Sequence, residues 1–255
     1  MTPILPSDRG LTLGDGLFET VLADRGRLVL WAKHMQRLAA GCETLGLPIP
    51  DANRCAEAAR SALAEAGLEE ARAAVRLSWT AGPGGRGLER PAILQPVLFT
   101  TAAASALDAS PLSLATVTVR RNPTSPASRL KTLAYLDNVL ARREARGAGA
   151  EEALMLETGG RLACAAAANL FWIEEGRLFT PALDCGVLAG TVRAALRDKF
   201  SAVEVAAPRE ALDGADAIFL TSSLIGVRAV ARLDGRDYHP GHALTQACAA
   251  FAAAL

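Results

Sequence analysis

The chain has 255 residues, of which 51% are hydrophobic and 21% are charged. This composition is typical of a globular protein that is long enough to bury one large core or two modest ones. The 27 basic residues balance the 27 acidic ones without any block of like charge, which excludes a surface for nucleic acid or for an anionic membrane. Any anion must therefore be bound by individual arginines.

The N-terminus and the cysteines exclude further classes of protein. No apolar run reaches the roughly 20 residues that span a bilayer, and the N-terminal sequence lacks the apolar core of a signal peptide. We therefore expect a cytoplasmic protein. The five cysteines are scattered, odd in number and without C-x-x-C spacing, so neither a disulfide framework nor a metal site is predicted.

The first half of the chain predicts a small α/β domain. After a turn-rich start, two short strands flank Arg25-Gly26 as a hairpin, and from Trp31 the apolar residues take helical spacing until Gly46. A second amphipathic helix and two further strands follow. The expected elements are a turn-rich segment at 8–16, strands at 17–22, 27–30, 74–79 and 93–99, and helices at 31–45 and 51–66.

The second half predicts a larger domain. Residues 101–111 are small and show no periodicity, so this stretch is the best candidate for an interdomain connection. We expect domains at residues 1–104 and 112–255 with a linker at 105–111, and a mixed α/β (α+β) fold. The expected elements are strands at 114–119, 153–156, 170–173 and 217–223, and helices at 136–146 and 191–199.

Lysine is rare in this chain, whereas arginine is common. Lys33, Lys131 and Lys199 are the only lysines among the 27 basic residues. The first and last lie in patterns typical of solvated helix faces, but Lys131 has no acidic residue within five positions. A lysine amine that is desolvated or close to a cation is partly neutral and can attack a carbonyl carbon, which an arginine cannot do. The residues alone leave two interpretations open: a Schiff-base lysine, and a lysine that reaches solvent from a strand end.

Two segments are candidates for binding a phosphate group. Gly190-Thr191-Val192 opens a helix, and a helix start presents backbone N–H groups and the positive end of a dipole. A plain helix entered through a glycine is an equally common explanation. The strand at 217–223 ends in three hydroxyl residues, Thr221, Ser222 and Ser223, which offer a second place.

A glycine-rich loop carries a single arginine. Arg86 lies among four glycines, in a spacing that differs from the dinucleotide-binding pattern. Glycines let a backbone come close to a ligand, and arginine holds carboxylates through two bonds. We therefore expect Arg86 to bind a substrate carboxylate, with a mobile loop tip as the competing interpretation.

In their order along the chain, these motifs resemble the fold-type IV pyridoxal-phosphate enzymes. This class IV aminotransferase family includes branched-chain and D-amino-acid aminotransferases and 4-amino-4-deoxychorismate lyase. The similarity runs from Asp8 to about Val230. It implies a small α/β N-terminal domain, a larger pseudo-barrel C-terminal domain, a homodimer, and pyridoxal 5′-phosphate as the cofactor.

The resemblance implies roles for individual residues. Lys131 matches the Schiff-base lysine, Arg37 the arginine that binds the cofactor phosphate, and Tyr135 the tyrosine that hydrogen-bonds the cofactor phenolate. The other implied cofactor-binding residues are Cys164, Asn169, Gly190, Thr191, Val192 and Ser223. The implied substrate-binding residues are Phe18, Thr20, Arg86 and Ser222.

Cys164 departs from the family pattern. The family places a glutamate five residues before the asparagine that is Asn169 here, and this glutamate pairs with the protonated pyridine nitrogen. A neutral thiol is a weak hydrogen-bond group. Four interpretations follow: a thiolate replaces the carboxylate, another residue supplies it, the electron sink is weaker, or Cys164 is simply a small packed residue. At Val192 the family usually has a threonine, so the backbone contact remains but a hydroxyl is lost.

Three functions compete on this resemblance. The preferred one is an aminotransferase that moves an amino group between an amino acid and a 2-oxo acid, because the run at 131–138 resembles the transaminase branches. The second is 4-amino-4-deoxychorismate lyase, which forms 4-aminobenzoate and pyruvate and which the segments 84–87 and 167–172 resemble. The third is a weakened or non-catalytic homologue without the usual glutamate, and the retained Lys131 argues against it.

Overall fold

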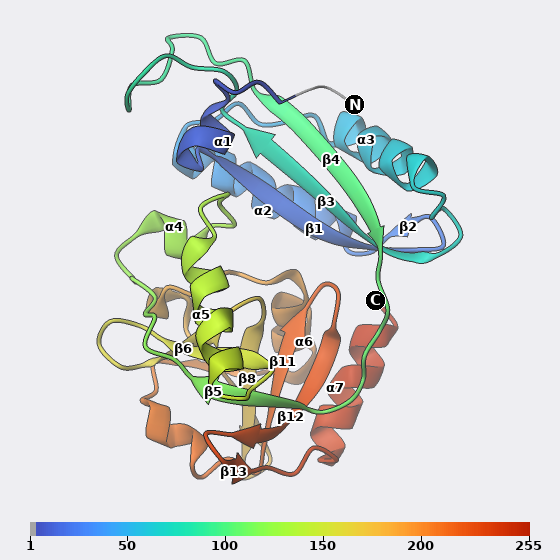
Figure 1. The fold of residues 1–255 in the computed structure, drawn as a ribbon. Helices are drawn as coiled ribbons and strands as arrows, with labels where there is room; N and C mark the ends of the chain where they lie inside the picture. Colours follow the sequence, from blue (N-terminus) through green and yellow to red (C-terminus); the bar gives the residue numbers. More distant parts are fainter. Residues whose placement is uncertain (1–3) are drawn as a thin grey trace. The chain divides into compact units, whose positions relative to one another are not determined.

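The structure is a computed structural model, and it describes residues 4–255 of the chain. Its contacts group into two compact units (Figure 1). The first contains the described residues up to Ala106 together with Leu130–Ala134, and the second contains Leu107–Arg129 and Tyr135–Leu255. The short segment around Lys131 therefore belongs to the N-terminal unit. The domain limits expected from the sequence stay a prediction.

The first unit is built on a four-stranded antiparallel sheet with the order β2-β1-β3-β4. The strand β1 (Gly16–Asp24) pairs along its whole length with β3 (Arg72–Thr80). The predicted hairpin is confirmed, since β2 (Arg27–Leu28) pairs with the end of β1. The strand β4 (Val97–Ala104) forms the other edge. Side chains of β1 alternate between the two faces of this sheet.

Two helices of the first unit pack on the sheet (Figure 1). The helix α2 (Trp31–Leu45) ends at Gly46, which has a left-handed φ of 63°. The helix α3 (Ala52–Glu65) begins after Asp51, whose side chain accepts a hydrogen bond from the N–H of Arg54. Both helices lie where the sequence predicts them. The core between sheet and helices consists of Val21, Ala23, Cys55, Ala59, Leu63, Ala73, Val75 and Leu77.

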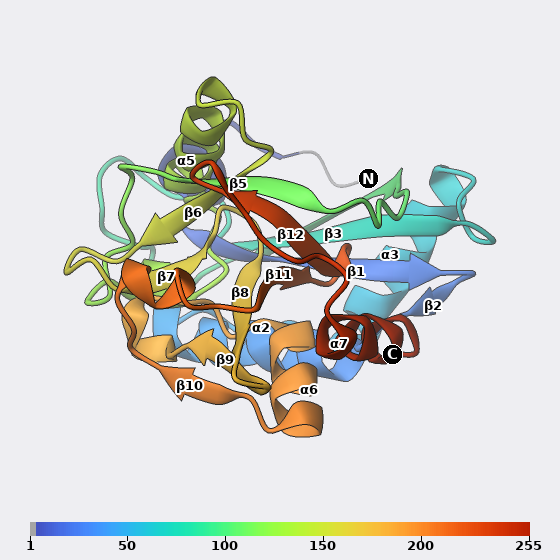
Figure 2. The same ribbon diagram turned by 90° about the horizontal axis from the view of Figure 1, so that it is seen from below.

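The second unit is built on a closed six-stranded barrel. The order around it is β8-β11-β12-β5-β6-β7, and the pairing of β7 with β8 closes the ring, whose strands can be followed in Figure 2. β5 runs parallel to both β12 and β6, and the other barrel neighbours are antiparallel. The strands are β5 (Leu112–Thr116), β6 (Glu152–Leu156), β7 (Leu162–Ala165), β8 (Asn169–Glu174), β11 (Ala217–Ser222) and β12 (Gly226–Leu233).

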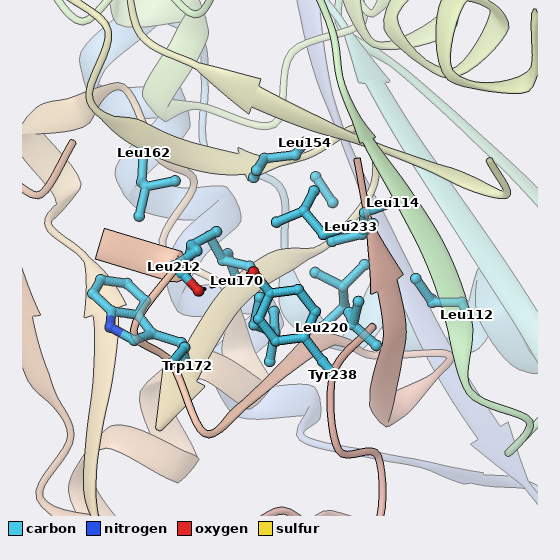
Figure 3. Packing of buried hydrophobic residues seen from close by; sticks show 14 of the residues in the cluster. Leu112, Leu114, Leu154, Leu162, Leu170, Trp172, Leu212, Leu220, Leu233 and Tyr238 are labelled. Carbon is cyan, nitrogen blue, oxygen red and sulfur yellow. Dashed lines mark hydrogen bonds between the residues drawn. The ribbon is translucent and has the colours of Figure 1, made fainter. Parts of the chain in front are cut away.

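Apolar side chains from all six strands gather in one buried cluster (Figure 3). Tyr238 joins them, and its hydroxyl donates to the carbonyl oxygen of Leu212 at 2.9 Å, so its polar end is satisfied inside the core. The remaining elements of this unit are α4 (Pro126–Arg129), α5 (Leu136–Gly147), β9 (Arg177–Pro181), η1 (Leu183–Cys185), α6 (Thr191–Phe200), β10 (Val203–Val205), η2 (Arg209–Leu212), β13 (Arg236–Asp237) and α7 (Ala243–Ala253).

The turn-rich start expected at residues 8–16 contains a short helix instead. In α1 (Arg9–Leu13), the Asp8 side chain accepts from the N–H of Gly10, and Gly14 ends the helix with a φ of 68°. Five residues are too few to show a helical period, so the capping residues were the available signal.

The strand expected at 93–99 begins only at Val97, because Pro96 has no N–H to donate and the residues before it form a loop. Residues 101–104, expected in the connection, instead continue β4 and pair with Arg76 to Ala73. Their small side chains gave no visible periodicity. The strand expected at 114–119 spans Leu112–Thr116.

Among residues 4–255, no helix is long and apolar enough to cross a membrane, and no group of three metal-ligating side chains is found. The five cysteines are all buried and free. Burial raises the pKa of all five thiols, for example that of Cys55 to about 11, so they are protonated at neutral pH.

Gly82→Ala should destabilise the first unit. Gly82 has a φ of 81°, and a Cβ at this position would lie 1.8 Å from the carbonyl oxygen of Gln95. We expect the free energy of unfolding to fall by about 2–3 kcal/mol in urea denaturation. Gly85→Ala is the matched control, because no atom lies within 4 Å of its added Cβ. An equal loss in both variants would contradict the explanation.

Candidate active site

The segment that carries Lys131 pairs with the start of β1. The N–H of Phe18 donates to the carbonyl oxygen of Lys131 at 2.8 Å, and the N–H of Leu133 donates to that of Gly16 at 3.0 Å. A glycine is needed at position 16, because a Cβ there would lie 2.5 Å from the Trp79 carbonyl oxygen and 2.8 Å from Leu133 Cδ1. This pairing fixes the backbone of Lys131 against the sheet.

The Lys131 amine lies over an aromatic ring and close to charged groups. Its Nζ is 4.1 Å from the ring centroid of Phe18, and the guanidinium carbon of Arg76 is 3.7 Å from the same centroid. The pKa of Lys131 is lowered to about 8. Burial is the largest cause, the cations Arg37 and Arg76 add to it, and the Glu19 carboxylate opposes them. An amine with a pKa near 8 is partly neutral at neutral pH, as a nucleophile must be.

Arg37, expected to bind phosphate, is held by a buried carboxylate. Its Nε and Nη2 donate to the two oxygens of Glu19 at 2.8 and 2.5 Å. His34 joins this group, with Nδ1 2.7 Å from Oε2 of Glu19. Glu19 and His34 are at most 1% exposed, and Arg37 retains 15% exposure. The sequence analysis did not single out Glu19, although a glutamate inside an apolar strand is an unusual position that signals a partner.

Arg76 is a second residue that the sequence analysis missed. It lies on β3 directly opposite Thr20 of β1, and Thr20 shares the Phe18 face of the sheet by alternation. The structure therefore brings Phe18, Thr20 and Arg76 to one side of the first unit. The available signal was an arginine between two buried apolar residues of a strand, Val75 and Leu77.

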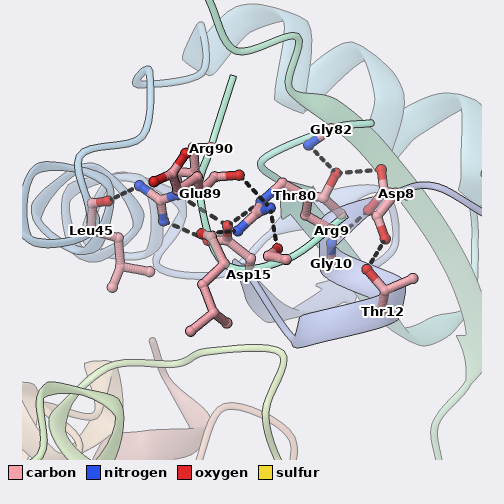
Figure 4. Close-up of polar contacts among 12 residues, drawn as sticks. Asp8, Arg9, Gly10, Thr12, Asp15, Leu45, Thr80, Gly82, Glu89 and Arg90 are labelled. Carbon is pink, nitrogen blue, oxygen red and sulfur yellow. Dashed lines mark hydrogen bonds and ion pairs between the residues drawn. The ribbon is translucent and has the colours of Figure 1, made fainter. Parts of the chain in front are cut away.

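Arg86 lies at an exposed position of its loop, and it makes no hydrogen bond or ion pair with the described residues. Arg9 and Arg90 hold this loop instead (Figure 4). The Arg9 guanidinium donates to the carbonyl oxygens of residues 87–89, and both arginines donate to the carboxylate of Asp15. These contacts anchor the loop directly after Arg86, whose role in binding a carboxylate stays a prediction.

The second unit contains the other residues that were expected to bind a phosphate, apart from Arg37. Gly190 precedes α6 with a φ of −67° and offers no side chain to cap the helix, so the first N–H groups, including those of Thr191 and Val192, point out of the helix start. The hydroxyl oxygens of Thr191 and Ser223 are 3.2 Å apart. Ser222 ends β11, directly before Ser223. These groups form a set of N–H and O–H donors at one helix N-terminus.

Asn169 and Arg193 hold the start of α6 in place. The Asn169 Nδ2 donates to the carbonyl oxygen of Leu188 at 2.9 Å, and its Oδ1 lies 2.0 Å from where a Cβ on Gly190 would stand. Arg193 is 2% exposed, donates to the carbonyl oxygen of Pro181 at 2.9 Å and pairs with a carboxylate of β10. The helix start is therefore fixed by side chains from two directions.

Cys164 and Tyr135 also belong to the second unit. Cys164 lies on β7 opposite Asn169 and packs with Ala163, Cys185 and Val187. Burial raises the pKa of this thiol, Arg121 lowers it and Glu152 raises it again. The net rise keeps Cys164 a neutral thiol at neutral pH. Tyr135 is partly buried and directly precedes α5.

The first unit carries a lysine whose pKa is lowered, and the second unit is a barrel with N–H and O–H donors at the start of α6. The family model described as amino-transferase class IV matches residues 16–233. The chain therefore belongs to the class IV aminotransferase family.

Individual relatives carry two kinds of name. A provisionally named branched-chain-amino-acid aminotransferase of Methanocaldococcus jannaschii is 30% identical over 90% of this chain and 82% of its own length. The aminodeoxychorismate lyase of Vibrio harveyi is 28% identical over 90% of this chain and 87% of its own. A crystal structure from Legionella pneumophila, provisionally named 4-amino-4-deoxychorismate lyase, has a TM-score of 0.90 at 30% identity and covers 98% of this chain and 95% of that one.

The family uses pyridoxal 5′-phosphate, and the residues of each unit fit a part of this cofactor. A carbonyl group requires an amine that is partly neutral, which Lys131 provides. A phosphate requires several converging donors, which the start of α6 and Ser223 provide. The pyridine nitrogen would meet no ionised partner at Cys164.

Gly190→Ala should weaken phosphate binding without unfolding the chain. The added Cβ would collide with Asn169 Oδ1 at 2.0 Å, so either the amide or the helix start must move. We expect the dissociation constant for pyridoxal 5′-phosphate to rise at least about tenfold, or 1.4 kcal/mol, in fluorescence titration. Gly147→Ala is the control, because no atom lies near its added Cβ. Unchanged affinity in Gly190→Ala would exclude this cradle as the phosphate site.

Proposed function

We propose that the protein is a pyridoxal-phosphate-dependent aminotransferase that moves an amino group between an amino acid and a 2-oxo acid. The observation that carries this proposal is the Lys131 amine, whose pKa is lowered to about 8 beside two arginines and the Phe18 ring. Membership of the class IV family supports the same reaction type.

Each residue has a defined task in this proposal. The cofactor supplies a carbonyl group that bonds amines and a ring that withdraws electrons. Lys131 would hold that carbonyl group through its Nζ and would serve as the general base for the proton on the substrate Cα. Arg37 and the donors at Thr191, Val192 and Ser223 would hold the phosphate. Tyr135 would donate a hydrogen bond to the phenolate oxygen.

The substrate contacts proposed are Phe18, Thr20 and Ser222, with an arginine for the carboxylate. The contacts of the first unit support Arg76 better than Arg86 for this task, because the Arg76 guanidinium lies over the Phe18 ring that also carries the Lys131 amine. Arginine recognises a carboxylate through two parallel N–H groups.

A specific observation favours 4-amino-4-deoxychorismate lyase as the second candidate. Both the Vibrio harveyi relative and the Legionella pneumophila structure carry that name, and the latter covers nearly the whole chain. The lyase would use the same Lys131 chemistry but release pyruvate. A neutral Cys164 in place of the usual glutamate supports modest turnover in either reaction, or a catalytically weakened homologue.

We also propose a homodimer located in the cytoplasm. The helix α5 supports the assembly, since Leu136, Val139 and Leu140 lie three and four residues apart and are 66%, 60% and 40% exposed. Substrates would be small amino acids and oxo acids rather than nucleic acid or a membrane, as the balanced charge indicates.

Borohydride reduction of the protein with bound pyridoxal 5′-phosphate should attach the cofactor to Lys131. The lowered pKa leaves part of this amine neutral, and therefore nucleophilic, at neutral pH. Peptide mass spectrometry locates the label, and Lys33 and Lys199 are internal controls in the same sample. A label on either of those two residues, or none after saturation with cofactor, would refute the proposal.

Two assays separate the candidate reactions. Incubation with an amino acid and a 2-oxo acid should yield a new amino acid, followed by chromatography. Incubation with 4-amino-4-deoxychorismate alone should yield little pyruvate, at least tenfold less per unit time. The reverse ratio would make the protein a lyase. Lys131→Ala controls both assays and should lower either turnover at least ~10³-fold, because it removes the nucleophile and the base.

A further inference from the structure

Glu19 is a buried carboxylate that has no role in the reaction proposed above. It lies in the middle of β1 and is 1% exposed. Two residues of α2, three apart and hence on one helix edge, turn toward it: His34 and Arg37. Taking such charged groups out of water costs several kcal/mol for each ion, and their attraction repays this only when the geometry is good. A cluster of this kind beside a functional amine therefore calls for an explanation.

The charge state of the cluster follows from its contacts. Burial raises the pKa of Glu19, but Arg37 and His34 outweigh it and bring the pKa to about 2. Glu19 is therefore ionised at any working pH, and an ionised carboxylate can only accept hydrogen bonds. Consequently the His34 Nδ1, 2.7 Å from Oε2, carries a proton and donates it to Glu19.

We propose that Glu19 is a positioning residue, which holds the Arg37 guanidinium in one plane and balances its charge beside the Lys131 amine. This inference rests on the role proposed above for Lys131. It assigns a task in the reaction to a residue that touches neither substrate nor cofactor in that proposal.

The two bonds between Glu19 and Arg37 account for the positioning. A guanidinium that donates through Nε and Nη2 to both oxygens of one carboxylate has its plane fixed by that carboxylate. Glu19 itself is fixed by the strand pairing of β1 on both sides. Without this partner, Arg37 would sample several rotamers, and ordering it on a phosphate would cost side-chain entropy.

Charge balance is the second part of the role. The charged groups that act on Lys131 come from three elements: Glu19 of β1, Arg37 of α2 and Arg76 of β3. With Glu19 ionised, they sum to one positive charge, and without it they sum to two. Because like charges disfavour an ammonium, loss of Glu19 would make the amine a weaker base. A general base works best with a pKa near the working pH, and Glu19 opposes a further fall below about 8.

A purely structural ion pair predicts the opposite sign. If Glu19 only stabilised the packing of α2 on β1, its loss would loosen the first unit and admit water to Lys131. Hydration favours the ammonium form, so the pKa of Lys131 would then rise. The direction of the change in one titration therefore separates the two roles.

The experiment is a titration of Lys131 in the full-length protein freed of cofactor, with Glu19→Gln compared to the wild type. Cyanate reacts with the neutral amine, so the pH dependence of its reaction rate reports the apparent pKa of each lysine. Mass spectrometry resolves Lys33, Lys131 and Lys199. We expect Glu19→Gln to lower the apparent pKa of Lys131 by at least half a unit, which at pH 7 raises its neutral fraction about threefold. An unchanged or raised pKa overturns the proposal.

Asp15→Asn is the matched control. Asp15 also accepts from two arginines of the first unit, Arg9 and Arg90, but it is not among the groups that act on Lys131. Its variant should leave the Lys131 titration as in the wild type. If Asp15→Asn lowers the apparent pKa of Lys131 as much as Glu19→Gln does, the effect comes from losing any buried ion pair, and the proposal is overturned.

A second variant covers the case in which Glu19→Gln does not fold. Arg37→Gln removes the cation of the same pair, and it should raise the apparent pKa of Lys131, whereas a lowered or unchanged value contradicts the charge-balance role.

These readouts do not depend on the cofactor. Failure to trap the cofactor on Lys131 would thus refute the proposed function alone, and a wrong sign here would refute the role of Glu19 alone.

Discussion

The hydrogen bonds between β1 and residues 130–134 are the constraint on which the first unit's chemistry depends. They bring a segment from the middle of the chain onto the N-terminal sheet and place the Lys131 amine 4.1 Å from the centre of the Phe18 ring. Successive side chains of β1 point to opposite faces of the sheet, so Phe18 and Glu19 lie on different faces and have different roles. One strand thereby supplies both the surface under the amine and the carboxylate that controls the charge near it.

Rigidity in the second unit has a different origin. A helix start binds anions through backbone groups, so its orientation matters more than any side chain on it. Gly190 lets Asn169 pack directly against the backbone, and Arg193, almost fully buried, ties the first turn of α6 to the end of β9. Val192 in place of the usual threonine is compatible with this arrangement, because it leaves the N–H group unchanged. The donors are thus fixed before any ligand arrives.

The sequence predicts features that depend on neighbouring residues and misses those that depend on distant ones. The limits of α2 and α3 follow from Gly46 and Asp51, and the rarity of lysine singles out Lys131. By contrast, Glu19 meets Arg37 only because a helix packs on a strand, and Arg9 reaches a loop nearly 80 residues away. Such contacts between distant segments have no periodic pattern in the sequence, so the anchoring of the Arg86 loop could not be foreseen. The pairing of β7 with β8, which closes the barrel, likewise has no periodic pattern in the sequence that would predict it.

The contacts of Cys164 narrow the four interpretations of this residue. A thiolate requires a lowered pKa, and burial raises the pKa here despite the cation of Arg121. A substitute carboxylate would have to come from nearby, and Glu152 is the one that acts on this thiol. Its Oε1 accepts from the N–H groups of Ala153 and Ala166, and its Oε2 pairs with Arg142, so three of its roughly four lone-pair sites are already occupied. A weaker electron sink, or a cysteine that only packs, remains favoured. In either case the basicity of Lys131 has to contribute more to the reaction, which gives the charge balance set by Glu19 its importance.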